Sequence, residues 1–349
     1  MNFFLSFKNL LLSSTCILLS ASLSGCQKPA SEISKEQHAE QKVEVIVPDL
    51  NQICENLKKE MREMTAQRTT FALEQINQNI RVCLPLISHA EQKKLMDLSN
   101  QMYAQFLQID RTPEQQKAFD EYALDESQYP TIQQSHFEKL HIRDQYLLRH
   151  KGQAYIELSD LNIHNISYKR NSQYLAKVFA PYFPEDEKEF MQNLADQNEV
   201  PFFNRNTLLI SPEEIAQRAL FWERYLKKFP KSRFKSDAQY IYDTYRTLLF
   251  IGLKDSPVST TYEDRLDVQP LTLSTIEQLS TQKDSALAVQ AGQFLTFIDM
   301  PPEQRMKLSH AQESDNAQAQ LMKMLNLKSV DLSQKQKRHC FEDAICYVS

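Results

Sequence analysis

Two histidines and a glutamate stand close enough in the sequence to raise the question of a metal site. The stretch HFEKLH contains His136, Glu138 and His141. A helical zinc site of the HExxH type needs histidines at positions i and i+4, with the glutamate directly after the first, so that both imidazoles share one face. Here the two histidines are five positions apart and their faces diverge. We therefore expect exposed helical histidines and predict no metal site.

A run of acidic residues offers a second candidate for chemistry. The stretch PEDEKEF places Glu185, Asp186 and Glu187 directly after Pro184. Paired carboxylates can act as general acid and base. Negative charge in the first turn of a helix also complements the helix dipole, and proline is well suited to a helix start. The second interpretation is favoured, so these residues predict the start of a helix.

Glycine is scarce, and this excludes several classes of site. The chain has four glycines, Gly25, Gly152, Gly252 and Gly292. Phosphate-binding loops and nucleophile elbows need several glycines at fixed offsets, and the sequence contains no P-loop, GxGxxG or GxSxG motif. We predict no catalytic residue and no cofactor, and we leave an envelope hydrolase assembled from distant residues as the least favoured alternative.

The N-terminus has the zones of an export signal. A polar start carries Lys8, an apolar stretch follows from about Leu10 to Leu19, and small residues come next. Serines at positions 13, 14 and 20 interrupt the apolar stretch, whereas a membrane-spanning helix wants about 20 apolar residues in succession. The pattern predicts a cleaved signal peptide over residues 1–25.

The end of this signal resembles the lipobox of bacterial lipoproteins, in the residues Leu23, Ser24, Gly25 and Cys26. The resemblance implies cleavage after Gly25, a diacylglyceryl group on the Cys26 thiol and an acylated amine. Two or more acyl chains anchor a protein durably to a membrane. Gln27 follows, where an aspartate would favour the inner membrane of enterobacteria, so we expect the outer membrane, facing the periplasm. The alternative is a secreted protein whose Cys26 is accidental.

Composition divides the rest of the chain. Residues 26–48 are polar and charged and predict a flexible tether that carries the lipid. Helical domains are expected over 49–200 and 201–349. The net charge of -5 becomes -6 once Lys8 leaves with the signal, and no cluster of basic residues stands out. Nucleic acid is therefore not an expected partner.

Four cysteines in the exported part predict two local disulfides, because an oxidising envelope favours such bonds. Cys54 with Cys83, and Cys340 with Cys346, are the pairs closest in sequence. The alternative is a metal site that uses His339 and both C-terminal thiols. Such a site would need a carboxylate as an uncommon fourth ligand.

Apolar periodicity predicts a mostly α fold built of helical hairpins. Ser88 and Glu91 form a capping box before one amphipathic stretch, and a longer helix is expected over 131–149. Residues 254–273 have the composition of a loop, along which a partner or peptide could lie. Helical patterning resumes at Ser274.

The clearest pattern is an αα-hairpin over residues 211–253. Ser211 and Glu214 begin an apolar stripe that contains Trp222, and Pro230 ends it. A second stripe follows, and Gly252 suits its C-terminal cap. The spacing predicts that Trp222 lies in the core.

The stretch RYLKKFPKSRFKSDAQYIY resembles the helix-turn-helix unit of tetratricopeptide-like envelope lipoproteins. The resemblance covers residues 211–253 and implies a short, irregular helical array. A stable solenoid needs three or more repeats, and only the stretch around Phe183 and Pro184 offers a partial second match. A single hairpin within another helical fold is the alternative.

Three functions follow from these observations. The first is a membrane-anchored, non-catalytic interaction or scaffold protein in cell-envelope assembly or maintenance, with a protein partner there. The second is a lipoprotein that binds a ligand or inhibits a hydrolase, with Phe202, Phe203 and Trp222 as candidate lining of a groove. The third is the hydrolase already mentioned. An exposed groove would favour the first, a closed pocket the second, and converging titratable groups the third.

Overall fold

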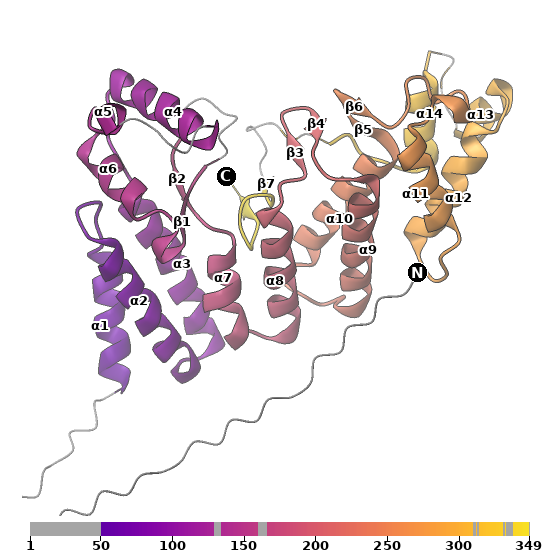
Figure 1. Cartoon of the computed structure of the whole chain (residues 1–349). Coiled ribbons are helices and arrows are strands. Elements are labelled where there is room, and N and C mark those ends of the chain that lie inside the picture. Colours follow the sequence, from indigo (N-terminus) through magenta and orange to yellow (C-terminus); the bar gives the residue numbers. More distant parts are fainter. Residues whose placement is uncertain are drawn as a thin grey trace, which may run out of the picture. The chain divides into compact units, whose positions relative to one another are not determined.

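The computed structural model describes residues 50–128, 134–159, 166–309, 312, 314–330, 332 and 338–348. Helices dominate these residues, as the sequence predicts, and the strands among them are short (Figure 1). The expected signal peptide, Cys26 and the tether lie outside this part of the chain. No helix within it has both the length and the hydropathy needed to cross a bilayer.

The N-terminal helices form a three-helix group in which α1 packs against both α2 and α3. Ser88 caps α3, and its hydroxyl accepts a hydrogen bond from the amide of Glu91 at 3.3 Å, as the capping box predicts. The elements of this region are α1 (Leu50–Arg62), α2 (Thr70–Cys83), η1 (Leu84–Leu86), α3 (His89–Phe106), α4 (Pro113–Gln128), α5 (Gln134–Phe137) and α6 (Ile142–Arg149).

The prediction of one long helix over residues 131–149 is wrong. Residues 131–133 lie outside the described part, and the rest forms α5 and α6, separated by a turn. His141 has extended backbone angles, and its ring nitrogen accepts a hydrogen bond from the amide of Arg143 at 3.2 Å. Leu140 is buried. The two helices are separate because the side chain of Leu140 packs into the core between them, and His141 then caps the N-terminus of α6.

The next elements lead from a small hairpin into a helix pair. Strands β1 and β2 pair antiparallel. Helix α8 begins directly after Pro184 with three acidic residues in its first turn, as predicted. The elements are η2 (Gln153–Tyr155), β1 (Ile156–Leu158), β2 (Tyr168–Arg170), α7 (Gln173–Val178), η3 (Ala180–Tyr182) and α8 (Glu185–Glu199).

The predicted hairpin is present as α9 and α10, which pack along their length. The hydroxyl of Ser211 caps α9 at the amide of Glu214, and Gly252 caps α10 with a φ of 78°. Two tight antiparallel hairpins flank the pair. The elements are β3 (Phe203–Asn204), β4 (Thr207–Leu208), α9 (Pro212–Lys228), α10 (Lys235–Ile251), β5 (Gly252–Leu253) and β6 (Ser256–Pro257).

A further pair, α11 and α12, packs against α9. Helix α11 begins at Pro270, so the expected loop over 254–273 is shorter than predicted and contains β6 and a 3-10 turn. The carboxylate of Glu223 in α9 accepts a hydrogen bond from the hydroxyl of Ser285 at 2.7 Å, beside the N-terminus of α12. The elements are η4 (Arg265–Asp267), α11 (Pro270–Ser280), α12 (Ala286–Ile298), α13 (Pro302–Ser309) and α14 (Ala317–Met324).

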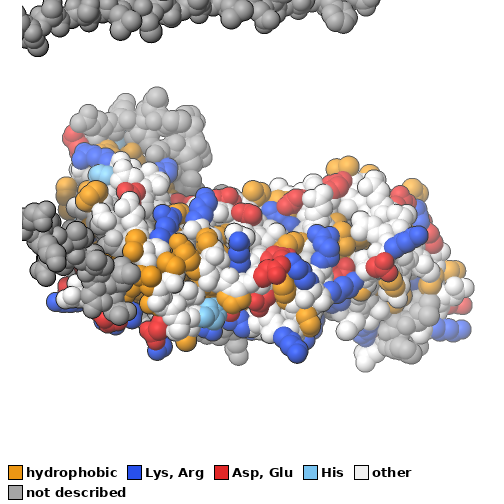
Figure 2. Space-filling view, turned by 90° about the horizontal axis from the view of Figure 1, so that it is seen from below, with side chains coloured by type: hydrophobic (Ala, Val, Ile, Leu, Met, Phe, Trp, Pro, Cys, Tyr) orange, Lys and Arg blue, Asp and Glu red, His pale blue; other side chains and the backbone are white. Residues whose placement is uncertain are grey.

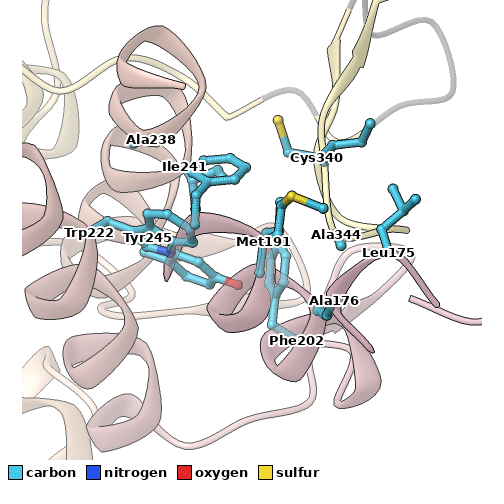
Figure 3. Packing of buried hydrophobic residues seen from close by; sticks show 14 of the residues in the cluster. Leu175, Ala176, Met191, Phe202, Trp222, Ala238, Ile241, Tyr245, Cys340 and Ala344 are labelled. Atoms are coloured by element: carbon cyan, nitrogen blue, oxygen red, sulfur yellow. The ribbon is translucent and has the colours of Figure 1, made fainter. Parts of the chain in front are cut away.

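The C-terminal segment returns to the middle of the helical unit. Strands β7 (Arg338–His339) and β8 (Tyr347–Val348) pair antiparallel. Between them Cys340 and Ala344 are buried and lie beside Met191 of α8 and Leu175 of α7 (Figure 3).

Residues 48–349 form one compact unit. The boundary expected at residue 200 is crossed by contacts of the C-terminal segment, including hydrogen bonds from Asn198 to the carbonyls of Cys340 and Asp343. The helix pairs begin at Gln173, Pro212 and Pro270, at unequal intervals. Successive hairpins are thus present, while the tetratricopeptide-like period is not confirmed.

Candidate binding groove

Two of the three side chains expected to line a ligand groove are core residues. Trp222 is fully buried, as its spacing predicts, and its indole N–H donates to the side-chain oxygen of Gln197 at 2.9 Å. Phe202 is also buried and packs edge-on against Tyr245, with ring centroids 5.2 Å apart. Phe203 is half-buried beside it. Figure 3 shows Phe202, Trp222 and Tyr245 in the same packed region.

The histidines of HFEKLH do not converge. His136 lies in α5 and is exposed, whereas His141 is the N-terminal cap of α6. Within the described ranges no three His, Cys, Asp or Glu side chains are arranged to hold a metal ion.

The acidic run after Pro184 makes ion pairs between elements. Glu185 contacts the ammonium of Lys228 at 2.9 Å. Glu187 is buried and lies 3.0 Å from the ring of His89 and 3.1 Å from the guanidinium of Arg233. These carboxylates hold α8 against α3 and the α9–α10 turn. Their geometry accounts for them without a catalytic role.

The cysteines form the two disulfides that the sequence predicts. Cys54 joins Cys83 with a Cα–Cα distance of 5.6 Å, and Cys340 joins Cys346 with a Cα–Cα distance of 4.1 Å. The first ties α1 to the end of α2, and the second closes the C-terminal segment. With both C-terminal thiols oxidised, the alternative metal site with His339 has no thiolate ligands.

A groove opens between the N-terminal ends of α9 and α11 and the C-terminal end of α10. It has a volume of about 400 Å³, within the range of ligand-binding clefts. Aliphatic and proline side chains make most of its lining, and four polar residues complete it. The lining residues are Leu208, Ile210, Pro212, Ile215, Leu248, Leu249, Asp255, Ser256, Pro257, Val258, Gln269 and Thr272. We call this feature the α9–α11 groove.

The β5–β6 turn forms one wall of the α9–α11 groove and depends on Gly252. A Cβ at this position would lie 2.3 Å from the carbonyl oxygen of Ser256, and the positive φ disfavours side chains as well. The Ser256 hydroxyl accepts a hydrogen bond from the amide of Leu208 at 2.8 Å, and the amide of Asp255 donates to the carbonyl of Asn206 at 3.0 Å. The two β-hairpins therefore brace each other beside the groove.

Two acidic residues belong to the elements around the α9–α11 groove, Asp255 in its lining and Glu213 outside it. Asp255 is the one charged residue in the lining, is exposed, and has no side-chain partner among the described residues. Glu213 lies at the start of α9 and reaches Thr275 of α11. Its own backbone amide, then the hydroxyls of Ser211 and Thr275, hold the pKa of the Glu213 carboxyl below its ordinary value. Glu213 is not among the lining residues, and Lys254, directly before Asp255, is exposed as well.

Exposed leucines stand next to the lining residues in sequence. Leu209, between two lining residues, is 55% exposed, and Leu271, beside Thr272, is 67% exposed. On another face, seen from below in Figure 2, charged side chains of both signs alternate over much of the surface.

Sequence reasoning missed this groove because its residues come from three separate stretches. The long loop over 254–273 was the one signal that pointed to it, since both Asp255 and Gln269 lie there. Nothing in the sequence showed that Leu208 and Ile210 would face the same space.

The α9–α11 groove offers hydrogen-bonding groups from Ser256, Gln269 and Thr272 and one carboxylate, that of Asp255, above aliphatic side chains that are themselves buried. It lacks a nucleophile paired with a base, since its titratable lining residue is Asp255 alone. Comparison with protein-family models, with curated proteins and with solved structures gives no match for this chain.

Proposed function

We propose that this chain is a lipid-anchored protein of the bacterial cell envelope whose task is to bind another envelope protein. The observation that carries this proposal is the succession of helix pairs with an open groove at one end of the α9–α10 pair. Helix pairs packed side by side present extended surfaces of the kind that scaffold proteins use. The resemblance of LSGC to a lipobox supports attachment through Cys26, with the outer membrane as the expected site.

The placement of the buried charges supports a scaffold role. Arg111 pairs with the fully buried Asp144, with its Nε 2.9 Å from a carboxylate oxygen. Arg218 pairs with Glu214 at 2.7 Å and donates to the carbonyl of Gln197 at 3.1 Å. The Arg111–Asp144 pair and the bond from Arg218 to Gln197 each join one element to another, whereas the Arg218–Glu214 pair lies within α9.

The helix pairs also favour an irregular, tetratricopeptide-like array as the finer description of the fold. Two features support this part of the proposal. One is the aromatic-proline step at Phe229 and Pro230, and the other is the adjacent packing of α9 against both α10 and α11.

Membrane fractionation tests the anchor. Cys26→Ala removes the thiol that would carry lipid, so the variant should carry no acyl group, should not mature normally and should be released from the membrane fraction. Cys16→Ala is the matched control, because it changes a cysteine within the expected signal that the lipobox does not use. Unchanged membrane partitioning of Cys26→Ala, with no acyl mass on the wild-type protein, would refute the anchor.

Affinity purification tests the partner. The full chain, solubilised from envelopes with mild detergent, should retain the same envelope protein in repeated purifications after cross-linking in the cell. Cys26→Ala should lose most of that cross-link because it no longer resides at the membrane. If repeated purifications retain no cross-linked envelope protein in common, the result would count against the proposed role.

A further inference from the structure

The C-terminal segment is held against the helices as a closed loop. The disulfide joins Cys340 to Cys346, six positions further along the chain, so that the residues between them are enclosed in a small ring. Within this ring Asp343 is buried. The side-chain amide of Asn198 in α8 donates to the carbonyl of Cys340 at 2.9 Å and to that of Asp343 at 2.7 Å. We call residues 340–346 the C-terminal loop.

The C-terminal loop supplies the counter-ion of a buried cation. The guanidinium of Arg170 lies 2.7 Å from the carboxylate of Asp343, and its other terminal nitrogen donates to the side-chain oxygen of Asn100 at 2.8 Å. The side chain of Arg170 is 6% exposed. A buried cation that loses its carboxylate is strongly destabilised. The position of the loop and the burial of Arg170 therefore depend on each other.

The two disulfides differ in how far solvent reaches them. Cys54 is 4% exposed and Cys83 is fully buried, so neither sulfur of the α1–α2 disulfide is accessible in the folded protein. Cys340 is also buried, but Cys346 is only half-buried. Thiol–disulfide exchange requires that a thiolate reach one of the two sulfurs. The C-terminal disulfide is therefore the one open to exchange while the helical unit stays folded.

Breaking the C-terminal disulfide changes how easily the loop can leave its place. A ring of chain has few conformations to gain on detachment, whereas an open segment has many. In the chain-entropy model, opening a ring of this length favours the detached state by about tenfold or more. Detachment would uncover Met191 of α8 and Leu175 of α7, beside which Cys340 and Ala344 lie (Figure 3).

We infer that the C-terminal loop is a redox-controlled latch. In the oxidised form it keeps Arg170 paired and covered, and its reduction by a dithiol frees the loop and opens Arg170 to solvent. This inference concerns regulation and goes beyond the proposed function.

The exchange proceeds in two steps. A thiolate of the dithiol bonds to the sulfur of Cys346, and the bond to Cys340 breaks, so that Cys340 leaves with the electron pair and takes up a proton. The second thiol of the reductant then attacks its own sulfur in the mixed disulfide and releases Cys346 as a thiol. The protein disulfide gains two electrons and two protons, and the dithiol is oxidised to a disulfide.

Stepwise reduction tests the chemical part of the inference. The full chain is titrated with dithiothreitol under native conditions, its thiols are alkylated, and the modified cysteines are mapped by mass spectrometry. We expect the C-terminal disulfide to be reduced at a concentration about tenfold or more below that needed for the Cys54–Cys83 disulfide. The second disulfide is the matched control within the same molecule. Reduction of both together, or of the α1–α2 disulfide first, would overturn the inference.

Amide hydrogen exchange tests the structural part. After selective reduction of the C-terminal disulfide, amides over residues 340–347 should exchange about tenfold or more faster, while amides of α9 and α10 keep their protection. The double variant Cys340→Ser, Cys346→Ser should exchange as the reduced protein does, with or without dithiothreitol. Loop amides that stay protected after reduction would show that the bond holds no latch.

A pair of carboxylate variants tests whether the loop is held on Arg170. Asp343→Asn removes the charge that pairs with Arg170, so loop amides of the oxidised variant should exchange about tenfold or more faster than those of wild type. Glu342→Gln is the matched control, because Glu342 is the neighbouring carboxylate of the same loop and is exposed. It should exchange as wild type does. Equal exchange in the two variants would contradict the part assigned to Arg170.

Discussion

Trp222 illustrates how a single side chain organises this core. Its ring lies edge-on to Phe190, with centroids 5.2 Å apart, and its N–H is satisfied by Gln197. The indole therefore joins α9 to α8 through both packing and a hydrogen bond. The backbone carbonyl of Gln197 in turn accepts a hydrogen bond from the guanidinium of Arg218. The tryptophan therefore belongs to a polar network as well as to the apolar stripe.

Replacing Trp222 by alanine should destabilise the protein by about 3–5 kcal/mol, because it removes a large buried ring and leaves Gln197 without its donor. Chemical denaturation of both proteins measures the difference. Val289→Ala is the control, since Val289 is 63% exposed and its truncation should change stability by less than about 0.5 kcal/mol. A Trp222→Ala protein as stable as wild type would contradict the core assignment.

Buried tyrosines should make the protein sensitive to alkali. Burial raises the pKa of four tyrosines to about 12. At pH below the unfolded value of about 10 these phenols are neutral in both states, and their contribution to stability is complete. As pH rises from about 10 to 12, the unfolded chain loses protons that the folded chain retains, so stability falls. The tyrosines are Tyr225, Tyr242, Tyr245 and Tyr262.

The expected slope is about 1.4 kcal/mol per pH unit for each such tyrosine within that interval. Denaturation at a series of pH values from 8 to 12 measures it, and absorbance near the tyrosinate band should rise together with unfolding. Tyrosinate absorbance that rises well before the loss of helical signal would show that these phenols are accessible in the folded state.

The sequence predicts the helices of this protein better than it predicts their interruptions. Caps such as Ser88 and Ser211 act on amides three residues away, so their effect is visible in a short stretch. The break at His141 depends on Leu140 entering a core made by distant residues, and no local pattern contains that information. The predicted loop ran to residue 273 because the residues before it are polar, so the start of α11 at Pro270 was predicted too late.

Gly252 is the element-scale test of the groove wall. Gly252→Ala should destabilise the protein by more than about 1 kcal/mol, because a Cβ would meet the Ser256 carbonyl and the backbone has a positive φ. Gly292 lies within α12 with no atom within 4 Å of an added Cβ. Gly292→Ala should therefore stabilise by roughly 0.5–1 kcal/mol. Thermal melts of both variants give the comparison, and equal shifts in one direction would refute it.

The disulfide between α1 and α2 is a second element-scale prediction. Cys54 and Cys83 are separated by 29 residues, and closing a loop of this length should contribute about 3 kcal/mol. The double variant Cys54→Ala, Cys83→Ala should lose about that amount in chemical denaturation. Peptide mapping without reduction checks the connectivity, and a linkage of Cys54 to either C-terminal cysteine would contradict the pairing.

At the scale of the whole molecule, one buried ion pair links the two halves that the sequence suggested as separate domains. The guanidinium of Arg170 lies 2.7 Å from the carboxylate of Asp343 and 3.0 Å from the hydroxyl of Tyr347. Composition could not predict this contact, because the residues are 173 positions apart. The boundary placed at residue 200 rested on local patterns and could not register a returning C-terminus.

Arg170→Met should destabilise the protein by about 3–5 kcal/mol, because it leaves Asp343 buried without its cation. The double variant Arg170→Met, Asp343→Leu removes both charges and should recover part of that loss. A double-mutant cycle by chemical denaturation measures the coupling. Losses that simply add would show that the two groups do not interact.

The returning C-terminal segment also constrains the order in which the protein can be made. Synthesis delivers a chain from its N-terminus, so the residues around Arg170 leave the ribosome before Asp343 does. Until the last residues arrive, Asn198 and Arg170 lack the partners that they have in the finished structure. Contacts of such long sequence separation form slowly. Completion of the fold therefore waits until the last residues of the chain have been made.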